Sequence, residues 1–217
     1  MTFSEENYLK AIYHLTTISD SGISTNAIAE IMDTKASSVT DMLKKLAEKD
    51  LVNYKKYQGV SLTEKGLLSA KMIVRKHRLW EVFLVEKLDF SWDEVHDVAE
   101  QLEHIKSEKL INKLDEFLDF PTEDPHGDPI PDALGQIKKI EKQLLSDLAE
   151  NQKGICVGVK DTSAEFLKYL DKQKIALGSS IEILGKESFD LSLKIKVDET
   201  EITISNKIAS NLFVKLV

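Results

Sequence analysis

The spacing of hydrophobic residues in the first 62 positions predicts three short helices followed by two short strands. Hydrophobic residues recur every three or four positions in each helix: Tyr8, Leu9, Ile12 and Leu15, then Ala27, Ile28 and Ile31, then Val39, Met42, Leu43 and Leu46. Ser4 and Ser24 are expected to cap the first two helices. Residues 51–54 and 60–62 resemble strands joined by KKYQG. This order of elements is typical of a winged helix-turn-helix domain.

The next segment is predicted to be helical throughout. From Thr63 a long helix with a broad apolar stripe extends to residue 88, and Ser91 and Ser107 are expected to cap two further helices. The apolar surface is large for a small unit, so part of it is expected to pack against a second copy of the chain. All four prolines lie in FPTEDPHGDPIPD, which marks a break. A polar, helical linker is expected at residues 137–153.

The pattern changes after residue 154 from helical to alternating. Leu191, Leu193, Ile195 and Val197 alternate with polar residues, and Ile202 and Ile204 continue the two-residue period. These residues predict a small β-barrel with one short helix near AEFLKYL. We therefore expect a mainly α N-terminal and middle part followed by a small all-β barrel. The expected boundaries are 1–70 for the winged helix, 71–136 for the helical part, 137–153 for the linker and 154–217 for the barrel.

Composition favours a cytoplasmic protein. The chain has 217 residues and one cysteine, so an intramolecular disulfide framework is excluded. No apolar run approaches the roughly 20 residues that a membrane span requires. The N-terminal MTFSEENYLK has no apolar stretch of the kind found in a secretory signal. We expect no partnership with a membrane and no small organic substrate.

The distribution of charge permits DNA binding although the net charge is −8. Residues 34–66 contain seven lysines and four acidic residues, and this local excess can attract phosphates. The third helix would enter the major groove with its early residues near base edges, and the hairpin would contact the backbone. The candidate DNA-binding residues are Lys35, Ser37, Ser38, Thr40, Asp41, Lys44, Lys55 and Lys56.

Two histidine and glutamate sets in the middle segment predict a metal site. At about 100° per residue, the residues His96, Glu100, Glu103 and His104 fall within one narrow wedge of a helix, with no Lys or Arg among them. A solvated helix face usually interleaves lysine with glutamate. His77 and Glu81 are four residues apart on the preceding helix. Imidazole and carboxylate ligands suit Mn²⁺, Fe²⁺, Co²⁺ and Zn²⁺.

Two other classes of protein remain open at this point. A winged-helix regulator that responds to an organic ligand would bind DNA without metal, and the histidines and glutamates would then be structural. A metallohydrolase would require a general base beside an open coordination position. The sequence contains no HExxH motif and no Ser/His/Asp or glycine-rich phosphate signature, so this class is weakly supported.

The order of these motifs resembles the DtxR/MntR family of metal-dependent transcriptional repressors. The winged helix is followed by RKHRLWE, VHDVAEQLEH and DPHGDPIP, and FLKYLDKQKIALGSSIEIL resembles the SH3-like, FeoA-like domain of the longer members. The resemblance covers nearly the whole chain. It implies two neighbouring metal sites: Asn7, Glu100, Glu103 and His104 in one, and His77, Glu81 and His96 in the other, with His126 and Asp161 as further ligands.

The resemblance also implies a metal and a mechanism. Iron-type members have Cys where this chain has Glu100, and a hard oxygen ligand favours Mn²⁺ over Fe²⁺. Asn7 departs from both patterns, which have Met or Asp there. We hypothesise a homodimeric repressor with two divalent ions per chain, which fixes two winged helices on a palindromic operator and controls metal-uptake genes. An Fe²⁺-responsive repressor is the alternative.

Overall fold

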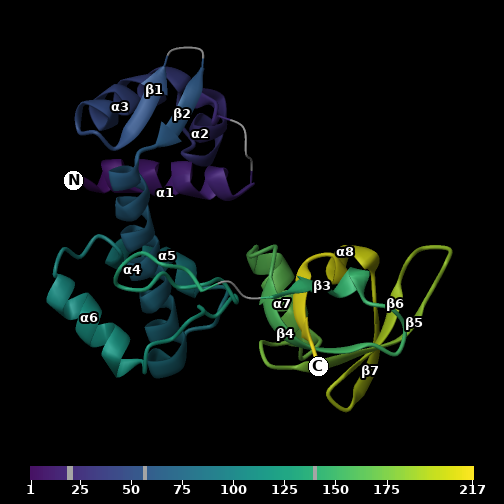
Figure 1. The fold of residues 1–217 in the computed structure, drawn as a ribbon. Helices are drawn as coiled ribbons and strands as arrows, with labels where there is room; N and C mark the ends of the chain where they lie inside the picture. Colours follow the sequence, from purple (N-terminus) through teal and green to yellow (C-terminus); the bar gives the residue numbers. More distant parts are fainter. Residues whose placement is uncertain (19–21, 56–57, 139–140) are drawn as a thin grey trace. The chain divides into compact units, whose positions relative to one another are not determined.

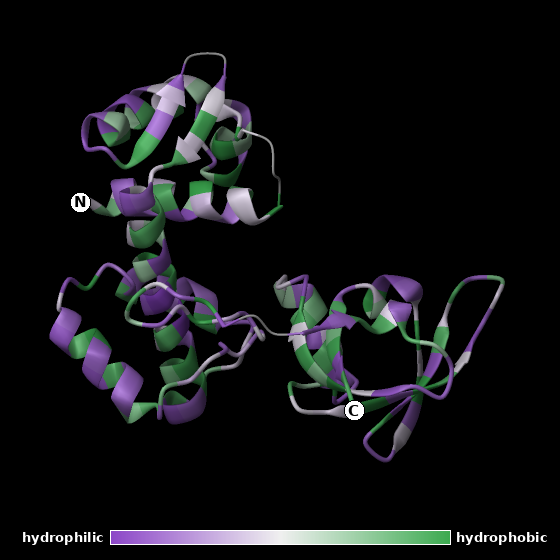
Figure 2. Ribbon diagram, viewed as in Figure 1, coloured by the Kyte–Doolittle hydropathy of each residue, from purple (hydrophilic) through white to green (hydrophobic). Residues whose placement is uncertain are grey.

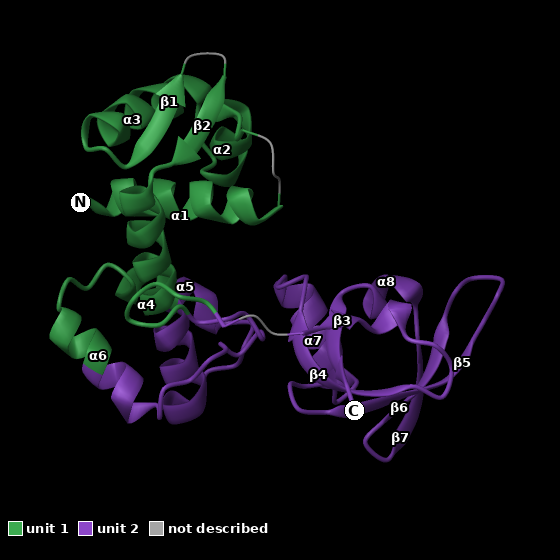
Figure 3. Ribbon diagram, viewed as in Figure 1, with its two compact units in different colours: residues 1–77, 100–112, 131–137 green, residues 78–99, 113–130, 138–217 purple. Residues whose placement is uncertain are grey.

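The computed structural model describes residues 1–18, 22–55, 58–138 and 141–217. Contacts divide the chain into two compact units that interleave along the sequence (Figure 3). Unit 1 contains residues 1–77, 100–112 and 131–137, and unit 2 contains residues 78–99, 113–130 and 138–217. The contiguous domain boundaries expected from the sequence stay a prediction.

The described residues among the first 62 form the expected winged helix, which lies in unit 1 (Figure 1). Its elements are α1 (Phe3–Ile18), α2 (Thr25–Ile31), α3 (Ala36–Glu48), β1 (Val52–Lys55) and β2 (Gly59–Leu62). The two strands are antiparallel, with Val52 opposite Leu62 and Tyr54 opposite Val60. Leu9, Ile12, Ile28, Val39, Leu43 and Leu46 are fully buried and form the core between the helices and the hairpin.

Local capping follows the sequence only in part. Ser24 caps α2 as expected, since its hydroxyl accepts the Ala27 N–H at 3.1 Å. The Ser4 prediction is wrong, because α1 already begins at Phe3 and Thr2 accepts the Glu5 N–H. The carboxylate of Glu5 in turn accepts the N–H of Thr2, which is a reciprocal capping box. Ile31 is 46% exposed rather than inward, because α2 ends at this residue.

Three further helices follow the wing. The long helix α4 (Glu64–Leu88) has the predicted extent, and its residues up to 77 belong to unit 1 while the rest belong to unit 2. The shorter helices are α5 (Val95–Leu102) and α6 (Glu108–Phe117). Ser107 caps α6 through a 3.3 Å bond from the Leu110 N–H, whereas Ser91 bonds to the Glu94 side chain and does not cap α5. Figure 2 shows hydrophobic and hydrophilic residues alternating along α6.

The C-terminal part of unit 2 is a six-stranded antiparallel sheet in the order β3-β8-β4-β5-β6-β7. The strands are β3 (Gln143–Leu144), β4 (Lys153–Val159), β5 (Ser180–Lys186), β6 (Leu193–Val197), β7 (Thr200–Ile204) and β8 (Leu212–Leu216), with helices α7 (Ala164–Lys172) and α8 (Asn206–Ala209). Leu193, Ile195 and Val197 are buried as their alternation predicts. Leu191 is exposed and has a φ of 58°, because it lies in the turn before β6.

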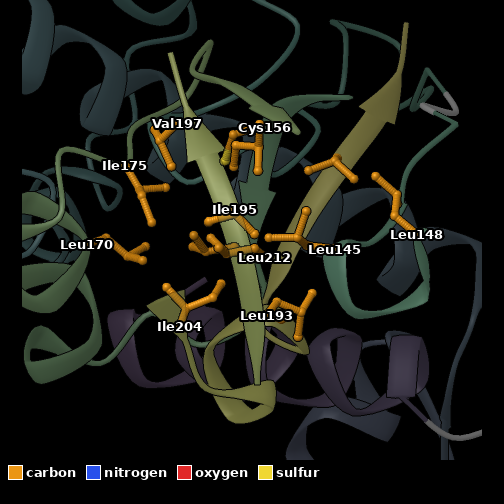
Figure 4. Packing of buried hydrophobic residues seen from close by; sticks show 14 of the residues in the cluster. Leu145, Leu148, Cys156, Leu170, Ile175, Leu193, Ile195, Val197, Ile204 and Leu212 are labelled. Carbon is orange, nitrogen blue, oxygen red and sulfur yellow. The ribbon is translucent and has the colours of Figure 1, made fainter. Parts of the chain in front are cut away.

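The helical linker expected at residues 137–153 is not what the described part of this segment forms. Gln143 and Leu144 form β3, which pairs with β8, and Leu145–Asp147 form a 3₁₀ helix. Leu145 and Leu148 are fully buried in the core of the sheet together with Cys156 and Ile195 (Figure 4). The barrel therefore begins before residue 154, because the sheet requires these leucines to complete its core.

No helix in the described residues is both long enough and apolar enough to span a membrane. The single cysteine, Cys156, is 2% exposed in the barrel core. Burial raises the pKa of its thiol to about 11, so the residue is an unreactive part of the packing.

Candidate metal centre and DNA-binding surface

Most of the candidate DNA-binding residues lie on or next to α3 and are exposed. Lys35, Ser37, Ser38, Asp41 and Lys44 are exposed, and Lys44 forms an ion pair with Asp41 at 3.3 Å. The hydroxyl of Thr40 is half-buried and donates to the Ala36 carbonyl at 3.0 Å. In the wing, Lys55 is exposed at the end of β1, and Lys56 lies outside the described residues.

Of the first set of predicted ligands, Glu100, Glu103 and His104 lie at the end of α5, and Asn7 lies on α1 in the same unit. We use the name first ligand cluster for Asn7, Glu100, Glu103 and His104. The helix ends at Leu102, so Glu103 and His104 lie in the turn that follows rather than on the helix. This turn directs both side chains inward, since Glu103 is 0% and His104 is 9% exposed. The helical backbone expected for Glu103 and His104 is therefore wrong, and their role as metal ligands stays a prediction.

Glu103 is the centre of this cluster. Its Oε2 accepts hydrogen bonds from Lys10 Nζ at 2.8 Å and from His77 Nδ1 at 2.6 Å. Burial raises the pKa of Glu103, but the bond from His77 and the charge of Lys10 outweigh this effect, and the pKa falls below its usual range. The wedge contains no cation of its own segment, as the sequence shows, but α1 places Lys10 beside it.

His104 is oriented by two residues of α1 that the sequence analysis missed. Its Nδ1 donates to Glu6 Oε2 at 2.7 Å, and its ring stacks on Phe3 with centroids 4.4 Å apart. Because a carboxylate only accepts, Nδ1 carries a proton, and in the neutral ring the lone pair is on Nε2. This Nε2 lies 4.0 Å from Oε1 of Glu103. A carboxylate that holds a histidine in this way is typical of metal sites.

Two buried oxygens in this region have no hydrogen-bond partner among the described residues. They are Oδ1 of Asn7 and Oε1 of Glu103. An unsatisfied buried acceptor is costly, and a bound cation is one kind of partner that satisfies such an oxygen. Together with the lone pair of His104, these donors fit a divalent ion.

A second group of potential ligands lies in unit 2. We use the name second ligand cluster for Glu81, Asp124 and His126, which are buried and have ligand atoms within 4.8 Å of one another. Asp124 was missed from the sequence because it lies in the proline-rich loop. Burial and the charge of Glu81 raise its pKa, and Arg78, 3.3 Å away, partly opposes this.

The imidazole of His126 is also held by hydrogen bonding. Its Nε2 donates to the carbonyl of Trp92 at 2.9 Å, and the two rings are stacked. In the neutral ring the lone pair is therefore on Nδ1, which lies 3.9 Å from Glu81 Oε2 and 3.8 Å from Asp124 Oδ1. These donors also fit a divalent ion, with a nitrogen and carboxylate oxygens as ligands.

His77, Glu81 and His96, the second ligand set expected from the sequence, also offer ligand atoms that lie within 4.8 Å of one another. His96 is 62% exposed at its side chain, with its Nδ1 3.4 Å from Glu81 Oε1. His77 lies one turn before Glu81 on α4 and contacts Glu103, so it is next to both sets along the helix. Asp161 is half-buried, and its carboxylate accepts the Ser163 N–H at 2.9 Å. Among the described residues, the second ligand cluster does not include Asp161.

A winged helix joined to clusters of oxygen and nitrogen ligands defines a DNA-binding protein that responds to metal. Three family models match the chain: the iron-dependent repressor N-terminal DNA-binding domain over residues 1–60, the iron-dependent repressor metal-binding and dimerisation domain over 63–132, and the FeoA domain over 143–216. These matches agree with the winged helix, the helices that carry the clusters, and the barrel.

Curated relatives and solved structures give the same result. The transcriptional regulator MntR of Oceanobacillus iheyensis is 33% identical over 150 residues, which are 69% of this chain and 98% of that protein. The iron-dependent repressor IdeR of Mycobacterium tuberculosis H37Rv is 35% identical over 128 residues, 58% of this chain but only 54% of IdeR. A solved manganese-dependent transcriptional repressor in complex with manganese is 34% identical, with a TM-score of 0.85, over 98% of this chain and all of that one.

The chain belongs to the DtxR/MntR family of metal-dependent transcriptional repressors. It is a repressor and not an enzyme. Its C-terminal barrel is the SH3-like FeoA domain of the longer family members.

Proposed function

We propose that this protein is a homodimeric, Mn²⁺-activated repressor of metal-uptake genes, acting in the cytoplasm on a palindromic operator. The observation that carries the proposal is that two buried oxygens, on Asn7 and Glu103, have no hydrogen-bond partner within the described ranges. The first ligand cluster has carboxylate, amide and imidazole donors and no thiolate. Hard ligands of this kind favour Mn²⁺. A similar solved repressor is named as manganese-dependent.

The first ligand cluster would couple metal to DNA binding through α1. A divalent ion supplies positive charge and bonds to oxygen and nitrogen donors. Asn7 belongs to α1 of the winged helix, whereas Glu103 and His104 follow α5. Sharing one ligand sphere would fix α1 against that turn, with Glu6 and Phe3 holding the His104 ring. In a dimer, fixing both winged helices sets the spacing of their α3 helices for two half-sites.

The second ligand cluster would join the proline-rich loop to the barrel. The Val159 N–H donates to the His126 carbonyl at 2.9 Å, so the loop that carries Asp124 and His126 is fastened to β4. We assign Glu81, Asp124 and His126 to the second ion, with His77, His96 and Asp161 as neighbours that can complete it. The barrel would then stabilise the active form by positioning this loop.

A metal-resolved DNA titration tests the proposal. Duplexes selected from a random pool in the presence of Mn²⁺ serve as the probe, and fluorescence anisotropy is measured anaerobically with Mn²⁺, Fe²⁺ or chelator. We expect tight binding with Mn²⁺ and at least about a tenfold loss with chelator. Equal affinity with chelator and with metal contradicts metal activation. Tighter activation by Fe²⁺ than by Mn²⁺ favours the iron-responsive alternative, for which the IdeR relatives argue.

The second ion has its own test in Asp124→Asn. This change removes one carboxylate charge from the second ligand cluster, so Mn²⁺ bound at saturation should fall from about two ions per chain to about one. Equilibrium dialysis followed by elemental analysis measures the ratio. The matched control is Asp128→Asn in the same loop, whose carboxylate is paired with Arg78 at 3.1 Å and is 46% exposed. An unchanged ratio in Asp124→Asn removes Asp124 from the site.

A further inference from the structure

Lys10 places a positive charge inside the first ligand cluster. Its Nζ lies 2.8 Å from Glu103 Oε2 and 3.2 Å from Glu100 Oε1, so one ammonium group bridges two carboxylates. The Lys10 side chain is 20% exposed and the Glu103 side chain is 0% exposed. The contact is therefore enclosed, unlike the exposed pair between Lys44 and Asp41 on α3.

The enclosure makes this ion pair energetically important. A buried carboxylate is costly unless a positive charge compensates it, and Lys10 provides that charge for Glu103. A divalent ion among the same ligands would compensate Glu103 as well. Two cations that contact the same buried carboxylate repel each other strongly, because little water lies between them to screen their charges. Lys10 and a metal ion are therefore alternatives for the Glu103 carboxylate.

We propose that Lys10 is a built-in competitor of the activating metal, and that it sets the metal concentration at which the repressor responds. The inference rests on the proposed function. Glu100 and Glu103 together carry two negative charges, and Lys10 cancels one of them. Asn7 adds an oxygen but no charge, so the lysine takes a large share of the attraction that would otherwise act on the metal.

The positions of the two carboxylates allow Lys10 to release Glu103 when metal binds. The Glu100 side chain is 45% exposed, so Lys10 can keep its bond to Glu100 at the edge of the cluster while it releases Glu103. A lysine side chain has a flexible four-carbon stem that permits this movement. Lys10 is also on α1, three residues after Asn7. Metal binding would thus replace one link between α1 and the α5 turn, made by Lys10, with another, made by Asn7.

The experiment compares Mn²⁺ affinity of the full chain and of Lys10→Met by competition with a fluorescent chelator. Removing the lysine charge should tighten Mn²⁺ binding by about tenfold or more. Half-maximal DNA binding should shift to lower Mn²⁺ by a similar factor. Lys10→Gln is a second neutral variant with the same expectation, and Lys10→Arg, which keeps the charge, should bind Mn²⁺ about as the wild type does.

The matched control is Lys49→Met, which makes the same change in net charge. Lys49 is paired with Glu5 at 2.6 Å. Glu5 is two residues from Asn7 in the sequence but is not a member of the first ligand cluster. Its Mn²⁺ affinity should stay within about twofold of the wild type. Suppose that the wild type binds Mn²⁺ and responds to it, but that Lys10→Met and Lys10→Gln bind Mn²⁺ with unchanged or weaker affinity. This result would overturn the competitor role of Lys10 and leave the proposed function standing. If neither wild type nor variants bind Mn²⁺ or Fe²⁺, the proposed function fails as well.

Discussion

Glu103→Gln is expected to abolish the metal response while the protein stays folded. The substitution keeps the shape of the side chain and an acceptor for Lys10 and His77, but it removes the charge of the only fully buried carboxylate in the first ligand cluster. Loss of partners around a metal ligand already costs about 10- to 100-fold in metal affinity. We therefore expect a loss of about 100-fold or more when the ligand itself is changed.

Calorimetry of Mn²⁺ binding and the DNA titration measure the two consequences of this substitution. Glu116→Gln on α6 is the matched control, since it makes the same chemical change at a 57% exposed side chain paired with Lys113. Thermal unfolding by circular dichroism shows whether the variant is folded. Normal Mn²⁺-dependent DNA binding by a folded Glu103→Gln protein would exclude Glu103 from the activating site.

Gly127→Ala is expected to unfasten the proline-rich loop from the barrel. Gly127 has a φ of 78°, and a Cβ at this position would lie 1.9 Å from the Val157 carbonyl oxygen and 2.4 Å from Gly158 Cα. Both obstacles are backbone atoms, so β4 and the loop would have to separate. Left-handed strain and a steric clash together should cost about 3 kcal/mol or more. The second ligand cluster should also lose metal affinity in this variant, because His126 directly precedes Gly127.

Gly178→Ala is the control that isolates the clash. Gly178 has a φ of 86°, but nothing lies within 4 Å of the position of its Cβ. This variant should lose only about 1 kcal/mol, from the left-handed conformation. Urea unfolding and Mn²⁺ stoichiometry measure both effects. Similar losses of stability in the two variants would show that the contact between the loop and β4 contributes little.

Local patterns predicted the elements well because they depend on near neighbours in the chain. The period of hydrophobic residues gave α3 and α4, and the two-residue alternation gave β6, since each element has one buried face. The linker prediction was wrong for a different reason. Residues 137–153 are polar on average, but Leu145 and Leu148 are required by a sheet whose other strands are distant in sequence.

Among the candidate ligands and their neighbours, too, local spacing predicted some residues, and contacts between distant segments brought in the others. His96, Glu100, Glu103 and His104 could be found from their spacing on one segment, and His77 and Glu81 from theirs. Glu6, Lys10 and Asp124 could not be found in this way, because each meets the cluster from another element. For Lys10, only the position of α1 shows that a common surface residue is an internal counter-charge.

The sequence by itself determined the family, the winged helix and the residue types that can bind metal. These properties follow from composition, periodicity and motifs, which are local along the chain. Only the tertiary structure decided that Glu103 and His104 leave the helix and turn inward, and that Lys10 lies beside them. It also decided that two oxygens have no partner in the described part of the chain. The physical reason is that burial and charge pairing depend on which segments meet, and packing sets those contacts.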